Sequence, residues 1–83
     1  MKKYRVKIEI RLKPGILDAE GRAIEKAIER FGVNAQNTRK GKIIEFELYA
    51  KEREEVESQV KSLTEKLLIN PLTEEYNLKI SDE

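Results

Sequence analysis

The fold is decided by one short stretch between two patterned segments, residues 13–21, which read KPGILDAEG. Pro14 has no N–H to donate to a sheet, so the alternating segment before it must end here. Asp18 stands where a helix N-cap belongs, because its carboxylate can accept hydrogen bonds from the first free N–H groups of a helix. Gly21 costs about 1 kcal/mol relative to alanine inside a helix, which indicates that something packs closely against that turn. The stretch therefore predicts a constrained junction between a strand and a helix.

The period of the apolar residues changes on either side of this junction. Residues 4–13 alternate between apolar and charged side chains, which predicts a strand with one buried and one solvated face. From about residue 19 to residue 31 the apolar side chains recur at helical spacing, and Gly32 follows them as a C′ glycine. These patterns predict a strand, a turn and an amphipathic helix.

The second half of the chain carries further strand and helix signals. Residues 33–39 form a weakly patterned polar stretch that we expect to be a short strand, paired in a hairpin with residues 42–50. Residues 51–69 carry a stripe of Val and Leu at helical spacing. This helix ends at Asn70-Pro71, because proline disfavours helical angles in the residue before it. A last alternating segment around residues 76–80 predicts a closing strand.

Two helices and four strands in this order predict a single domain of the α+β class over residues 1–83. We expect a two-layer sandwich with β-α-β-β-α-β order, a mainly antiparallel sheet and both helices on one face. This is a ferredoxin-like arrangement or a close relative of it. An exposed sheet edge must be paired with another strand or shielded from one. We therefore expect a second copy of the chain to pair with an edge of this sheet.

Composition excludes the enzyme sites that depend on histidine or cysteine. The 83 residues contain no cysteine and no histidine, which excludes a disulfide framework, a thiolate metal site and the commonest general base. No apolar run approaches the roughly 18 residues of a membrane span, and we expect a cytoplasmic protein. Charged residues make up 40% of the chain, a composition that fits a thermophile protein. Lys+Arg 17 and Asp+Glu 16 leave a net charge of only +1, whereas a small RNA-binding module would show a basic excess.

Three groups of charged residues could carry chemistry, and each also has a structural interpretation. Asp18 and Glu20 are close enough for a paired-acid site, but an N-cap and a first-turn acid explain both. Glu45 and Glu47 share a strand face and could hold a hard cation, but cross-strand ion pairs are commoner for such residues. Residues 39–42, Arg-Lys-Gly-Lys, form a basic turn that could contact an anion or a partner. We predict no catalytic, cofactor-binding or metal-binding residues.

Three segments of the chain resemble signatures of the PurS family. The first is the junction itself, residues 13–21, followed by Ala23-Ile24. The second is residues 37–45, NTRKGKIIE, and the third is residues 66–76, KLLINPLTEEY, which is similar to the KLLANPVIEDY ending of that family. The resemblance extends over the whole chain, with the three segments in order. Thr38 departs from the family by replacing a more usual apolar residue.

The resemblance implies a function that composition could not show. Members of the family are the small accessory subunit of phosphoribosylformylglycinamidine synthase, an enzyme of de novo purine synthesis. In that assembly a glutaminase subunit releases ammonia from glutamine, and a large synthetase subunit uses the ammonia together with ATP and magnesium. The small subunit has no chemistry of its own and binds no cofactor. It joins the other two subunits and helps ammonia to pass between them.

The resemblance also implies partners and interface residues. We expect the glutaminase and synthetase subunits as partners, a homodimer or homotetramer of this chain, and no nucleic acid or membrane. The expected interface residues, which contact a partner or shape the contact surface, are Lys13, Asp18, Arg39 and Lys42. The fold by itself leaves another class open, because a ferredoxin-like dimer with polar loops could instead be a regulatory domain that senses a small ligand.

Overall fold

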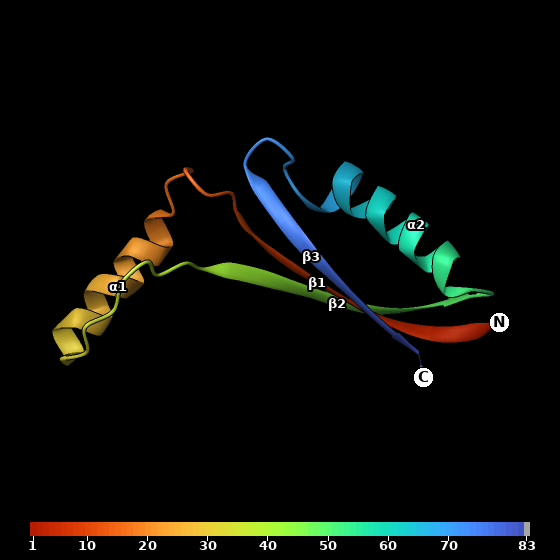
Figure 1. Ribbon diagram of the computed structural model, residues 1–83, viewed down its shortest axis with the longest axis horizontal. Coiled ribbons are helices and arrows are strands. Elements are labelled where there is room, and N and C mark those ends of the chain that lie inside the picture. Colours follow the sequence, from red (N-terminus) through yellow and green to blue (C-terminus); the bar gives the residue numbers. More distant parts are fainter. Residues whose placement is uncertain (83) are drawn as a thin grey trace.

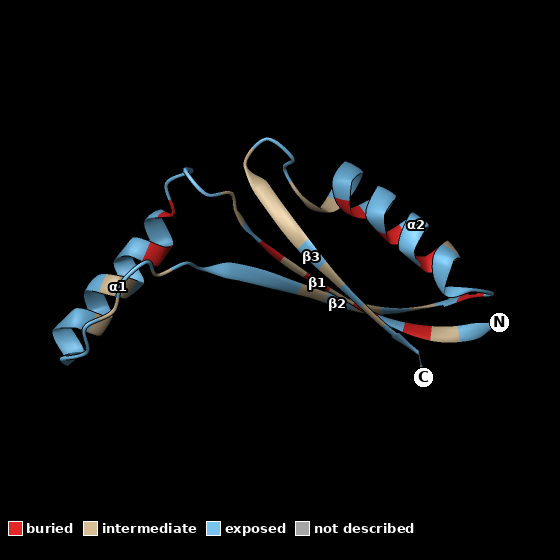
Figure 2. Cartoon of the chain, in the orientation of Figure 1, coloured by how far each residue is buried: buried red, intermediate tan, exposed pale blue. Residues whose placement is uncertain are grey.

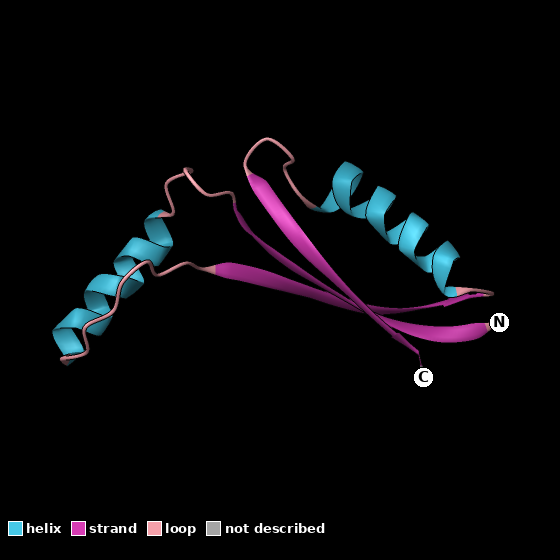
Figure 3. Ribbon diagram, viewed as in Figure 1, coloured by secondary structure: helices cyan, strands magenta, loops and turns pink. Residues whose placement is uncertain are grey.

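The computed structural model describes residues 1–82, which form three strands, two α-helices and one π-helical turn (Figure 1). In chain order these are β1 (Lys2–Leu12), α1 (Ala19–Phe31), β2 (Gly41–Ala50), α2 (Arg53–Leu63), η1 (Thr64–Leu68) and β3 (Glu74–Asp82). Figure 3 shows the strands in one twisted layer, with α2 alongside it and α1 beyond its end. No helix in this part of the chain is both long and apolar enough to cross a membrane.

β1 is the central strand of the sheet, whose order is β2-β1-β3 with antiparallel pairing on both sides. Val6 lies opposite Phe46 of β2 and Ile80 of β3, so the apolar positions of the three strands share one face. The even-numbered residues of β1 from 4 to 10, all apolar, are at most 2% exposed. The predicted α+β class with a mainly antiparallel sheet and two helices is confirmed.

The apolar face of the sheet is covered by α2 and η1. Val56 and Val60, about one helical turn apart, are fully buried, and so is Thr64 at the start of η1. The Ile69 N–H donates to the Thr64 carbonyl at 3.1 Å, five residues back, which is the wider turn of a π-helix. This turn places Leu68 and Ile69 against the core. Figure 2 shows the buried positions along one side of α2, facing the sheet.

Unlike α2, α1 lies beyond the end of the sheet rather than on its face (Figure 1). Gly21 is the only buried residue of α1, and this helix has no extensive packed interface with the strands. The chain is therefore elongated, with extents of 51 × 27 × 13 Å. The expectation that both helices cover one face holds for α2 alone, because polar contacts hold the start of α1 at the end of β1.

The connection from α1 to β2 runs back along α1 without joining the sheet, so the short strand expected at residues 33–39 is absent (Figure 1). The Thr38 N–H donates to the Glu25 carboxylate at 3.0 Å instead of to a neighbouring strand. Asn37 has a φ of 57°, in the left-handed region that interrupts an extended segment. The described chain therefore has three strands rather than four. We call α1 and this connection, residues 19–40, the arm.

Candidate functional site

The four predicted interface residues lie together at one end of the sheet, where the arm begins. Two of them, Lys13 and Asp18, belong to the connection between β1 and α1. The other two, Arg39 and Lys42, lie on either side of the first residue of β2. We call this region, residues 13–18 together with 38–42, the arm base.

The Asp18 carboxylate joins the two chain segments of the arm base. It is 7% exposed and accepts hydrogen bonds from the Gly21 N–H and from the Lys40 N–H, each at 2.8 Å. The bond from Lys40 is the largest cause of the lowered pKa of Asp18, followed by the bond from Gly21. The Arg39 guanidinium, 4.0 Å away, lowers this pKa further. The predicted N-cap is confirmed, and the bond from Lys40 adds a long-range contact that the local pattern did not indicate.

The Arg39 side chain ties the start of β2 to the end of β1. Its Nη2 group donates to the main-chain carbonyl of Leu12 and, at 3.2 Å, to that of Lys13. A guanidinium suits this position because it presents several N–H donors in one plane. The side chain is 34% exposed, and its Nη2 group bonds to the chain itself.

Lys13 and Lys42 connect the arm base to the region where β3 begins. Lys13 donates its main-chain N–H to the Thr73 carbonyl at 2.9 Å and its Nζ to the Pro71 carbonyl at 2.7 Å. The Nζ of Lys42 lies 3.5 Å from the carboxylate of Glu74, the first residue of β3. Both lysines therefore make contacts within the chain, and their role as contacts to a partner stays a prediction.

Gly21 is the point of closest approach between α1 and the connection that follows it. A Cβ atom here would lie 2.6 Å from the main-chain oxygen of Thr38, a separation that side chains essentially never show. The bond from the Thr38 N–H to Glu25 holds the connection in this place. The close contact predicted from a glycine inside a helix is confirmed, and its partner is the connection itself.

The arm base shows no arrangement of groups for metal binding. No cluster of three or more acidic, histidine or cysteine side chains that could hold a metal ion occurs among the residues that the structure describes. Glu47, one of the two strand acids considered for a cation, pairs with Lys3 at 3.4 Å and with Arg5 at 3.5 Å. Lys40 pairs with Glu20, and the hydrogen bond between them raises the pKa of Lys40. These charged groups are therefore paired within the chain.

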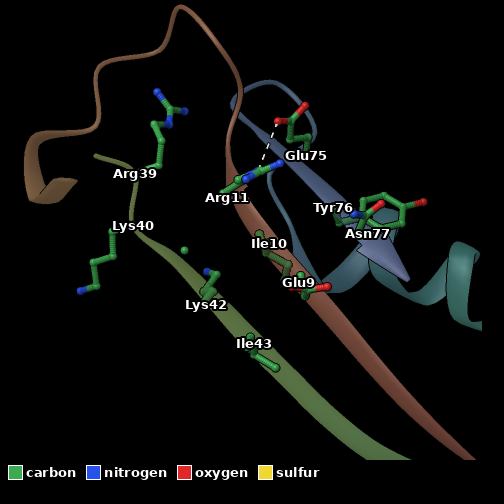
Figure 4. Close-up of a pocket in the computed structure, with 11 residues that line it drawn as sticks. Glu9, Ile10, Arg11, Arg39, Lys40, Lys42, Ile43, Glu75, Tyr76 and Asn77 are labelled. Atoms are coloured by element: carbon green, nitrogen blue, oxygen red, sulfur yellow. Dashed lines mark ion pairs between the residues drawn. The ribbon is translucent and has the colours of Figure 1, made fainter. Parts of the chain in front are cut away.

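A hollow of about 430 Å³ lies beside the arm base and is lined by all three strands (Figure 4). In this hollow Arg11 pairs with Glu75 at 3.7 Å, while Arg39 and Lys40 point away from it. The cations of the basic turn therefore do not converge on a common point. The turn at residues 39–42 joins the arm to the sheet, and a contact between this turn and an anion or a partner stays a prediction.

The arm base and the loop that precedes β3 expose apolar side chains that no sequence pattern indicated. Leu17 is 66% exposed, and Leu72, in the loop that Lys13 contacts, is 82% exposed. Neither residue lies in a strand or a helix. The signal that could have found them is an apolar residue inside a turn segment that contains Pro, Gly or Asn, where polar residues are usual.

The chain matches the family model PurS, described as phosphoribosylformylglycinamidine (FGAM) synthase, over residues 5–82. It is 32% identical to the phosphoribosylformylglycinamidine synthase subunit PurS of Methanothermobacter thermautotrophicus, over 96% of this chain and 95% of that protein. It is also 32% identical to the subunit of the same name from Bacillus subtilis, over 95% of this chain and 94% of that protein.

Solved structures match the elongated form of the chain as well as its sequence. The crystal structure of the PurS subunit from Thermotoga maritima has a TM-score of 0.88 at 30% identity, covering 95% of this chain and 92% of that one. A chain in the structure of PurLQS from the same organism has a TM-score of 0.90 at 30% identity, covering 98% of this chain and 100% of that one. The match at this coverage includes the arm.

Proposed function

This chain belongs to the PurS family, and from that premise we propose that it is the small, non-catalytic subunit of FGAM synthase in de novo purine synthesis. It joins the glutaminase subunit to the ATP-dependent synthetase subunit in the cytoplasm and supports the transfer of ammonia between them. ATP and magnesium are bound by the synthetase subunit, and this chain holds no cofactor.

The observation that carries this proposal is the match of 98% of the chain to a chain of the PurLQS structure. An arm that makes little contact with its own sheet is suited to a protein that is completed by assembly. A sequence without histidine or cysteine agrees with a subunit that performs no acid–base or nucleophilic step of its own.

Ammonia transfer supplies the chemical reason for a bridging subunit. Ammonia is a nucleophile only while it is neutral, and bulk water near pH 7 protonates most of it. A subunit that holds the glutaminase outlet against the synthetase inlet allows ammonia to react before it escapes to bulk water. For that purpose the bridging subunit must be rigid, and the hydrogen bonds of the arm base provide rigidity.

In this proposal a second copy of the chain covers apolar side chains that α1 leaves exposed. The returning connection covers α1 at Gly21, but Ile24 is 40% exposed and Phe31 is 87% exposed. With the exposed Ala27 these residues follow helical spacing, so they form an apolar strip along α1 that is open to solvent. Both outer strands of the sheet, β2 and β3, also have an unpaired edge. We therefore propose a homodimer or a larger symmetric oligomer, which light scattering of the purified chain tests.

The coupling role is tested by synthetase turnover with FGAM synthase's two other subunits present. Each assay uses glutamine or ammonium chloride as the nitrogen source, with and without this chain. We expect glutamine-driven turnover to require the chain and ammonium chloride to bypass part of that requirement. Equal glutamine-driven turnover without the chain would overturn the proposal. The ligand-sensing alternative would then be tested by thermal shift against amino acids and nucleotides, since a ligand that binds the native state raises Tm.

A further inference from the structure

The apolar face of the sheet has a single helical segment, α2 with η1, lying over three strands. An α-helix is about 10 Å across with its side chains, and neighbouring strands lie about 4.8 Å apart, so one helix covers about two strands. From residue 4 to residue 10 the apolar side chains of the central strand β1 are at most 2% exposed. By contrast, Ile44, Phe46 and Leu48 of the edge strand β2 are only half-buried. The apolar face above β2 is therefore incompletely covered.

The flank of α2 and η1 that faces β2 is apolar as well. Thr64 faces the core, and Glu65, which follows it, accepts a hydrogen bond at 3.0 Å from the hydroxyl of Tyr76 on β3. Leu63, which precedes Thr64, and Leu67, about one turn further on, therefore lie on the opposite flank, toward β2. Leu63 is 37% exposed and Leu67 is 72% exposed. An apolar flank of the helix thus borders the incompletely covered strand.

These side chains of the helix and of β2 belong to one surface, which we call the α2–β2 face. Its members are Ile44, Phe46, Leu48, Leu63 and Leu67. A contiguous apolar surface of this kind marks a contact site, whereas single exposed leucines are ordinary. Because the surface combines one flank of a helix with a sheet face, the element that suits it is a second amphipathic helix packed beside α2.

The helix α1 has an apolar side that its own chain leaves open. Ile24 is 40% exposed, Phe31 is 87% exposed, and Ala27 between them is exposed. Two helices over one sheet are usual for a β-α-β-β-α-β order, and α1 is the helix missing from this sheet. In its own chain α1 does not reach the α2–β2 face, because the hydrogen bond between Asp18 and Lys40 holds the arm beyond the end of the sheet (Figure 1).

We propose that α1 of a second copy lies on the α2–β2 face, and that two copies exchange their α1 helices reciprocally. This inference rests on the proposed function, which includes a symmetric oligomer, and it adds the surface on which α1 packs. Each sheet then carries two helices, one of its own and one from the other copy. The exchange of an identical element between copies is a low-cost route to a dimer.

The exposed side chains offer enough area for a stable dimer. Two-fold symmetry makes the contact twice, so two α1 surfaces and two α2–β2 faces are buried. If each of these four surfaces buries about 300 Å², the total reaches the roughly 1,200 Å² at which stable interfaces begin. Phe31, which is 87% exposed, supplies roughly 150 Å² or more of one surface. Ile24 and Ala27 extend this surface along α1.

The first test measures the oligomeric mass and the dissociation constant of the full-length chain by light scattering and sedimentation. Phe31→Ser removes an anchor from α1, and Leu67→Ser removes one from the α2–β2 face. We expect each variant to weaken self-association by about tenfold or more, since truncating a central apolar anchor has an effect of this size. The dissociated variants should fold like the wild type, because both side chains are largely exposed in the single chain.

The matched control is Leu72→Ser, which removes a leucine that is 82% exposed and lies outside both surfaces. It should self-associate within about twofold of the wild type. An effect of Phe31→Ser without one of Leu67→Ser would overturn the inference, because α1 would then pack on a different surface. An equal loss in the control, or no loss in either variant, would overturn it too.

Cross-linking then locates the contact, because the chain has no native cysteine. Ala27→Cys is mixed with Ile44→Cys, and separately with Ile43→Cys, and each mixture is treated with a short bis-maleimide. Adjacent residues of a strand point to opposite faces of the sheet. We therefore expect a cross-linked dimer from the mixture with Ile44→Cys and several times less from the mixture with Ile43→Cys, and equal yields would overturn the inference.

The proposed function can fail independently of this inference. A wild-type chain that stays monomeric, while glutamine-driven turnover of the synthase requires it, would overturn the exchange of α1 and leave the coupling role standing. Glutamine-driven turnover that does not require the chain would overturn the coupling role, whatever the cross-linking yields. The two assays therefore distinguish the two failures.

Discussion

In the sheet under α2 the apolar side chains of β1 from residue 4 to residue 10 are at most 2% exposed, whereas the only buried residue of α1 is a glycine. The sheet is therefore stabilised by apolar burial, the largest favourable contribution to folding. The arm is held at its base by hydrogen bonds and ion pairs, each of which contributes modestly in water. The difference shows how one short chain can fold a core by itself and still present a fixed, open arm for assembly.

The two regions should differ most in how far an isoleucine-to-alanine substitution lowers the free energy of unfolding. Ile8 is fully buried, so Ile8→Ala should lower the free energy of unfolding by about 2–5 kcal/mol. Ile24 is 40% exposed, so Ile24→Ala in the dissociated chain should cost less than about 1.5 kcal/mol. Urea unfolding at low protein concentration measures both. Equal losses would contradict the view that α1 is open in the single chain.

A smaller effect is expected from Gly21→Ala at the closest approach within the arm. The added Cβ would lie 2.6 Å from the Thr38 oxygen, so the connection must move, at a cost of about 1–3 kcal/mol for overpacking. This cost opposes the gain of about 1 kcal/mol that alanine brings to a helix. Hydrogen exchange of the arm amides measures the net effect, with Ala27→Gly as the control for helix propensity alone. A variant stabilised by the full propensity gain would show that the contact is absent.

The smallest effect on overall stability is expected from Asp18→Asn. The amide keeps one acceptor oxygen but presents an NH₂ group to one of the two N–H donors, at Gly21 or Lys40, and loses the charge. We expect arm amides to lose about tenfold in hydrogen-exchange protection, while protection of the β1 amides stays unchanged. Exposed Glu20→Gln is the control, and loss of protection in β1 as well would show that the arm and the sheet unfold as one unit.

The same carboxylate gives the arm a defined pH dependence. Because the pKa of Asp18 is lowered from 3.8 by the Lys40 and Gly21 N–H groups, its contribution to stability is present above 3.8. The contribution is lost as the pH falls below that value through the folded-state pKa. Protection of the arm amides in the wild type should therefore fall in this acidic range, and the Asn variant should lack that step.

Most of the secondary structure could be predicted because its signals are local. The alternation of β1, the cap at Asp18 and the helical spacing of α1 act over a few neighbouring positions. Residues 33–39 were predicted wrongly as a strand, since their weak pattern is decided by contacts with α1 and not by their own periodicity. The position of α1 differed from the expectation for a related reason: amphipathic spacing shows that a face needs cover but does not specify which surface provides it.

The sequence predicted which four residues would lie together, but it did not predict which groups they would bond to. Lys13, Asp18, Arg39 and Lys42 do meet at the arm base, yet their polar groups bond to carbonyls, N–H groups and carboxylates of the chain itself. Sequence patterns direct attention to charged residues in turns. They do not show which of these charges the folded chain pairs internally, and so they passed over apolar residues such as Leu72.

The sequence by itself determined the three observed strands, the two helices and the constrained junction, but not the absence of a strand at residues 33–39, because apolar periodicity and capping residues operate within a few positions along the chain. It also determined that histidine and cysteine chemistry is excluded, since composition does not depend on the fold. Only the tertiary structure decided where α1 lies and what Asp18 and Lys13 contact. The two hydrogen bonds join residues whose separations along the sequence are 22 and 58 positions. Residues so far apart meet only when the whole chain folds, and no local sequence pattern indicates their contact.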